Sequence, residues 1–93
     1  MAFRRTLEMG LGREELFRSL HVLLPSFDVD GDTVRWSEGE GHGTIRIVPM
    51  AGRALGSVVL PCYRVEIVLD GCPEEDGEAF MHRFHRAFLR GGG

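Results

Sequence analysis

The stretch Cys62–Asp70, CYRVEIVLD, decides how this chain folds, because polar and apolar residues alternate along it. Successive side chains of a β-strand point to opposite faces, so this alternation predicts a strand with one buried and one solvent-facing side. The solvent-facing side carries Arg64, Glu66 and Val68. The inward-facing residues are Tyr63, Val65, Ile67 and Leu69.

Four more segments upstream have strand character. Residues 3–9 alternate in the same way, and in residues 44–49 Ile45 and Ile47 point inward. Residues 27–36 predict a tight hairpin that turns at Asp30-Gly31 and pairs Phe27 with Val34. We expect residues 37–43 to form a solvated loop, residues 51–53 a turn, and Pro61 to bend or bulge a long strand between residues 57 and 69.

Two amphipathic helices complete the pattern. The first lies between Gly12 and Pro25, and its leucines recur at helical spacing. The second begins at Pro73 and ends near Arg90, where three glycines follow. Gly77 lies in the middle of its apolar stripe, so this helix should approach the sheet closely. The predicted buried face consists of Gly77, Phe80, Met81, Phe84, Ala87 and Phe88.

The order strand, helix, four strands, helix predicts an α+β domain: an antiparallel sheet of about five strands with both helices on one face. The segments that carry it are residues 3–9, the helix to Leu24, the strands through Leu69, and the helix ending in Phe84-His85-Arg86-Ala87-Phe88. This arrangement resembles the half-repeat of the TATA-binding protein and a reduced helix-grip domain of the birch-allergen and START type. The resemblance implies a fold and transfers no binding residues.

Composition limits the function. A chain of 93 residues has room for one domain, residues 1–93, with a short flexible tail at 91–93. The net charge of −3 disfavours nucleic acid, and no apolar run approaches the roughly 20 residues that span a bilayer. Without a signal-peptide pattern at the start, we expect a cytoplasmic protein. Cys62 and Cys72, at opposite ends of one strand, are too far apart for a disulfide.

Three constellations suggest chemistry, and each has a plainer interpretation. The aspartates at 28, 30 and 32 lack the glycine and glutamate that a calcium loop needs at its sixth and twelfth positions. Glu78, His82 and His85 have helical spacing for zinc but lack a fourth ligand. Cys72 near a helix start suits a thiolate, yet Glu74 and Glu75 oppose it. We therefore assign no catalytic residue, metal or cofactor.

The candidate binding surface is the solvent-facing side of the sheet, where charged residues and valines mix. Such a surface suits a protein partner or a second copy of the chain, and it also matches an ordinary solvated face whose ion pairs contribute little. Acidic residues between the arginines would repel phosphate. The surface consists of Arg35, Arg46, Val48, Arg64, Glu66 and Val68.

The first functional hypothesis is accordingly an interaction module, without enzymatic activity, that uses this face or a sheet edge, such as the bent strand around Pro61, for a protein partner or a homodimer. The alternative is a carrier of a small apolar ligand held between the last helix and the sheet. That pocket would be lined by Trp36, Phe80, Phe84 and Phe88. A thiol- or metal-dependent enzyme is the third hypothesis.

Overall fold

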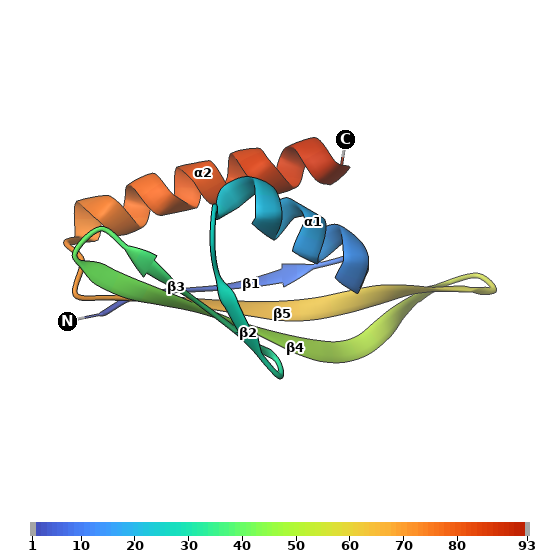
Figure 1. Cartoon of the computed structure of the whole chain (residues 1–93). Coiled ribbons are helices and arrows are strands. Elements are labelled where there is room, and N and C mark those ends of the chain that lie inside the picture. The colour runs from blue at the N-terminus through green and yellow to red at the C-terminus, as the bar shows by residue number, and fades with distance from the viewer. Residues whose placement is uncertain (1, 93) are drawn as a thin grey trace.

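The computed structural model describes residues 2–92 and contains five strands and two helices (Figure 1). Their order along the chain is the predicted one. The elements are β1 (Ala2–Met9), α1 (Arg13–Leu23), β2 (Asp28–Asp30), β3 (Thr33–Glu38), β4 (Gly41–Leu55), β5 (Val58–Asp70) and α2 (Glu74–Gly92).

The strands form one antiparallel sheet in the order β1-β5-β4-β3-β2. The first strand therefore pairs with the last one, Phe3 opposite Leu69, and the hairpins from β2 to β5 follow in sequence. Both helices lie on the same face of this sheet, as Figure 1 shows. The predicted α+β class, with two helices on one side of an antiparallel sheet, is confirmed.

The core lies between the helices and the sheet, and α2 contributes most of its aromatic side chains. All six residues of the predicted apolar stripe are buried, and Phe80 and Phe84 are completely enclosed. Gly77 lies against the ring of Phe3 on β1, and a Cβ atom there would overlap the ring. The glycine thus permits the close approach of α2 to the sheet that the sequence predicts.

The predicted register of the first hairpin is wrong, because the turn lies one residue later than expected and the partner of Val34 changes by two residues. Val29 pairs with Val34 across a turn formed by residues 31 and 32, so Val34 is not opposite Phe27. The reason is the backbone of Gly31, whose φ of 62° places glycine at the first of the two central turn positions. A type I′ turn at Asp30-Gly31 would have required a positive φ at Asp30 as well, which glycine adopts more readily than aspartate.

The predicted loop at residues 37–43 is also wrong, because these residues form a second tight hairpin. β3 continues to Glu38, which pairs with Gly41 across a two-residue turn. Gly39 begins this turn with a φ of 58°. The other glycine of the segment, Gly43, lies under the ring of Trp36, so glycine-rich sequence here reflects strand packing as well as turn geometry.

The expected turn at residues 51–53 is a bulge instead. The register of β4 against β5 shifts between Met50 and Arg53, and the chain reverses later, at Gly56, with a φ of 64°. Pro61 lies opposite the bulge, between the partners Leu60 and Cys62. Proline has no N–H for the ladder, so an irregularity at this point is expected, and the predicted bend near Pro61 falls at the same place.

The second helix reaches Gly92, two residues beyond the expected end, and Gly93 lies outside the described residues. Its first turn contains Glu74, Glu75 and Asp76, which complement the positive end of the helix dipole. Within residues 2–92 no helix combines the length and the apolarity needed to cross a membrane.

Candidate functional site

The solvent-facing side of the sheet contains the six residues predicted for it. Arg35 lies on β3, Arg46 and Val48 on β4, and the other three on β5; the arginines are exposed and the rest are half-buried. The register places Arg46 directly opposite Glu66, and Val48 opposite Arg64. The alternation along each strand was sufficient to predict this face.

Charges on this face are largely neutralised by one another. The Arg46 guanidinium lies 3.5 Å from Asp32 and 4.0 Å from Glu66, and Arg64 lies 3.8 Å from the same glutamate. Arg35 lies 3.4 Å from Asp30. Because these side chains are mostly well exposed, each pair contributes at most about 1 kcal/mol to stability. Each of the three arginines predicted for this face thus has an acidic side chain within 4.0 Å.

The most unusual surface of the molecule is the far end of the hairpin formed by β4 and β5, which we call the arm and define as residues 49–62. Figure 1 shows it extending well beyond both helices, and the molecule measures 47 × 23 × 21 Å. Three consecutive apolar residues on its β5 strand are exposed: Val58 by 55%, Val59 by 67% and Leu60 by 40%. Met50 on β4 is exposed as well.

The arm is a ribbon of two strands without neighbours. The pairing of β1 with β5 ends at Tyr63, and the pairing of β3 with β4 ends at Arg46. Beyond these points the described residues provide no further strand, so the backbone of the arm has two open edges. A lone two-stranded hairpin is marginally stable in water, and open edges accept additional strands or partner surfaces.

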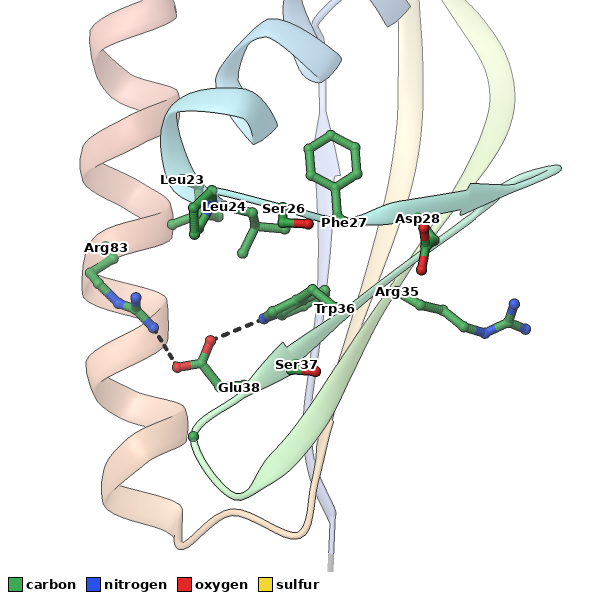
Figure 2. A pocket seen from close by; sticks show the side chains of 12 residues that line it. Leu23, Leu24, Ser26, Phe27, Asp28, Arg35, Trp36, Ser37, Glu38 and Arg83 are labelled. Atoms are coloured by element: carbon green, nitrogen blue, oxygen red, sulfur yellow. Dashed lines mark hydrogen bonds and ion pairs between the residues drawn. The ribbon is translucent and has the colours of Figure 1, made fainter.

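A groove of about 560 Å³ opens at the other end of the sheet, beside the carboxyl end of α1 (Figure 2). Leu23, Leu24 and Phe27 form one wall, and Trp36 lies on β3 across from them. Asp28, Arg35, Glu38 and Arg83 add charged groups to its rim.

Glu38 organises this end of the groove. Its Oε1 accepts a hydrogen bond of 3.0 Å from Nε1 of Trp36, and its Oε2 lies 2.7 Å from Nη2 of Arg83 on α2. The carboxylate therefore connects β3 to α2 and satisfies the indole N–H, which would be costly to bury unbonded. The indole and the guanidinium are held as fixed parts of the groove.

The aromatic residues predicted to line a ligand pocket pack against one another. Trp36 stacks on Phe80 with ring centroids 5.2 Å apart, and Phe84 stacks on Phe88 at 4.2 Å. All four rings are buried, and of these only Trp36 contributes to the groove. The hypothesis of an apolar-ligand carrier stays a prediction, and a ligand would have to use the groove or displace the phenylalanines.

Cys72 fills a structural position in the turn before α2. Its thiol lies 3.4 Å from the carbonyl oxygen of Glu38 and 3.8 Å from that of Asp70, as a weak donor to both. Both cysteines are free and half-buried. Among the residues that the structure describes, no cluster of three His, Cys, Asp or Glu side chains is placed to hold a metal ion.

Sequence reasoning named the bent strand around Pro61 as a candidate contact edge but missed the length and the exposure of the arm, and it missed the groove entirely. One signal for the arm was available: Val58, Val59 and Leu60 are consecutive, so apolar side chains occupy both faces of that strand. A strand covered on one side alternates, and a run without alternation is either buried on both faces or outside the two-layer core. The groove had no such signal, because α1, β3 and α2 meet there only in the folded chain.

Comparison of the chain with protein-family models, with curated proteins and with solved structures finds no match. The resemblance to the half-repeat of the TATA-binding protein and to helix-grip domains therefore stays a prediction. What defines the molecule is its architecture: a two-layer α+β domain with an apolar two-stranded arm at one end and a groove at the other.

Proposed function

We propose that this protein is a protein-binding module whose contact element is the arm. The observation that carries the proposal is the exposure of three consecutive apolar side chains, Val58, Val59 and Leu60, on a hairpin whose far end extends beyond both helices. Solvent-exposed apolar residues are common singly, whereas apolar side chains exposed on both faces of one ribbon indicate a binding element.

Burial of this group would supply much of the free energy of an interface. Complete burial of one valine or leucine side chain contributes about 1.5–3 kcal/mol, so three of them can offset a large part of the cost of association. The open edges of the ribbon would add backbone hydrogen bonds to a partner. The solvent-facing side of the sheet is less suited to this role, since Arg46 and Arg64 there already pair with acidic side chains of the same molecule.

Site-specific crosslinking in living cells tests the proposal. A photo-crosslinking amino acid is placed at position 58 on the arm, and the control protein carries it at position 22. Val22 is a matched control because its side chain is 68% exposed but lies on α1. We expect discrete adducts from position 58 and none from position 22. Absence of adducts from position 58, or identical adducts from both, would contradict the proposal.

A further inference from the structure

We infer that β1 is the edge through which two copies of this chain associate. The β1 strands of the two copies pair antiparallel about a two-fold axis at Thr6, so that the two sheets join into one. This interface is separate from the arm, because the arm begins where the pairing of β1 with β5 ends. The inference therefore adds a second contact element to the proposed one and does not depend on it.

β1 is the longer of the two edge strands of the sheet. It has eight residues, whereas β2 at the opposite edge has three, and within residues 2–92 no strand pairs with the outer side of β1. Its pairing with β5 runs over all eight residues without a register shift. Proteins often protect such an edge with a proline or a bulge, and β1 contains neither. A further strand can therefore extend the sheet here.

Three charged side chains lie on β1, and the molecule itself neutralises one of them. Arg5, on the helix-facing side, lies 2.5 Å from Glu78 of α2. Arg4 and Glu8 are exposed on the other face. Among the described side chains neither of these two forms an ion pair, although Glu8 lies opposite Arg64 in the ladder. The edge thus offers one positive and one negative group to a partner strand.

The positions of these two charges select a second copy as that partner. A two-fold ladder centred on Thr6 places Arg4 of each copy opposite Glu8 of the other, so two complementary cross-strand pairs form. On the helix-facing side Phe3 lies opposite Met9, and both already pack against the core of their own copy. Directly opposite residues of an antiparallel ladder point to the same face, so both helix layers lie on one side of the joined sheet.

Other registers and other strands fit less well. The pairing can slip only in steps of two residues without exchanging the faces. An axis at Arg5 would place that arginine opposite itself, and an axis at Leu7 would leave Arg4 beyond the end of the partner's β1. A foreign strand would need an acid and a base at the same spacing in the reverse order. A second copy provides this order by symmetry, and it uses each favourable pair twice.

The first measurement is the mass of the purified chain by light scattering over a range of concentrations, with circular dichroism to establish that each variant is folded. We expect the wild-type chain to reach twice its mass of 10.4 kDa. Arg4→Glu should raise the dissociation constant at least about tenfold, because it creates a like-charge pair at both symmetric places. Arg18→Glu is the matched control: Arg18 is also exposed but lies on α1, and the change in net charge is the same.

The second measurement exchanges the charges. Glu8→Arg alone should weaken the dimer as Arg4→Glu does, and the double variant Arg4→Glu/Glu8→Arg should restore the dissociation constant of the wild-type chain. The two single variants should bind each other more tightly than either binds itself, because each glutamate of one then faces an arginine of the other. Fluorescence transfer between labelled copies measures this preference.

The third measurement locates the two-fold axis and leaves both charges in place. Thr6→Cys should give a crosslinked dimer under mild oxidation, because directly opposite Cα atoms lie about 4.5–5.5 Å apart, within the range of a disulfide. Ala2→Cys is the control, since the two copies of this exposed residue would lie roughly 26 Å apart at ~3.3 Å per residue. Mass spectrometry of the linked peptides distinguishes these bonds from links through Cys62 or Cys72.

The outcomes separate the inference from the proposed function. A wild-type chain that remains monomeric, a dimer that tolerates Arg4→Glu as well as Arg18→Glu, or a double variant no tighter than the single ones would overturn the inference. Crosslinking at residue 2 and not at residue 6 would overturn it as well. None of these results changes the adducts expected from position 58, so the proposed function of the arm is tested independently.

Discussion

Single residues decide how closely the two layers approach. Gly77 of α2 lies against the Phe3 ring, and Gly43 of β4 lies under the ring of Trp36. At both positions the hydrogen atom of glycine leaves the space that an aromatic ring fills. Protein interiors are packed to the density of organic crystals, so one additional carbon atom at such a place has to displace its neighbours.

Gly77→Ala should destabilise the protein by about 1–2 kcal/mol in urea unfolding. Overpacking costs about 1–3 kcal/mol, and the gain in helix propensity returns up to about 1 kcal/mol of it. In the background Phe3→Ala, where the ring is gone, the sign should reverse and Gly77→Ala should stabilise by about 0.5–1 kcal/mol. Stabilisation by Gly77→Ala in both backgrounds would show that the close approach is not what requires glycine.

At the scale of the elements, the three hairpins share one feature of their turns. The three turns that connect β2 to β5 each begin with a glycine of positive φ: Gly31, Gly39 and Gly56. Among residues 2–92 no residue other than glycine has a positive φ. Turn position therefore follows the glycine, and the strand register follows the turn.

Gly39→Ala should reduce the free energy of unfolding by about 1–2 kcal/mol, because alanine is strained in the left-handed region. A Cβ at this position meets nothing within 4 Å, so the loss would come from the backbone alone. Gly10→Ala is the control, since Gly10 has no positive φ and a Cβ there has ordinary contacts, the nearest at 3.9 Å. Equal losses in the two variants, measured by thermal unfolding, would contradict this explanation.

The whole molecule divides into a core that holds the fold together and an arm that contributes little to it. The buried residues belong to the helices and to the part of the sheet that they cover, while the described side chains between 50 and 60 are exposed. Since an exposed ribbon buries little apolar surface, its removal should leave the core intact.

Replacement of residues 50–62 by a four-residue turn, Ser-Asn-Gly-Ser, should therefore give a folded protein. Its thermal midpoint, measured by circular dichroism, should stay close to that of the wild-type protein, because every buried residue of the core is retained. Unfolding of the variant at room temperature would show that the arm belongs to the core.

Much of the fold and part of the candidate site could be predicted from the sequence. The alternation of Cys62–Asp70 predicted both which residues are buried and which ones form the exposed face, including Arg64 and Glu66. The helical spacing of the last segment likewise predicted the buried face of α2. These predictions succeed because a side chain's direction depends on the local backbone period alone.

Tertiary structure alone decided the lengths of the strands, the position of the bulge, and the separation of the arm from the groove. Residues 37–43 and 51–53 look like loops by composition, yet the first segment forms the paired ends of a tight hairpin and the second a bulge within β4, because neighbouring strands pair on either side of each. The groove forms where α1, β3 and α2 meet, and Glu38 of β3 bonds there to Arg83 of α2. Such contacts join residues far apart in the chain, and no local period of the sequence encodes which distant surface each one will meet.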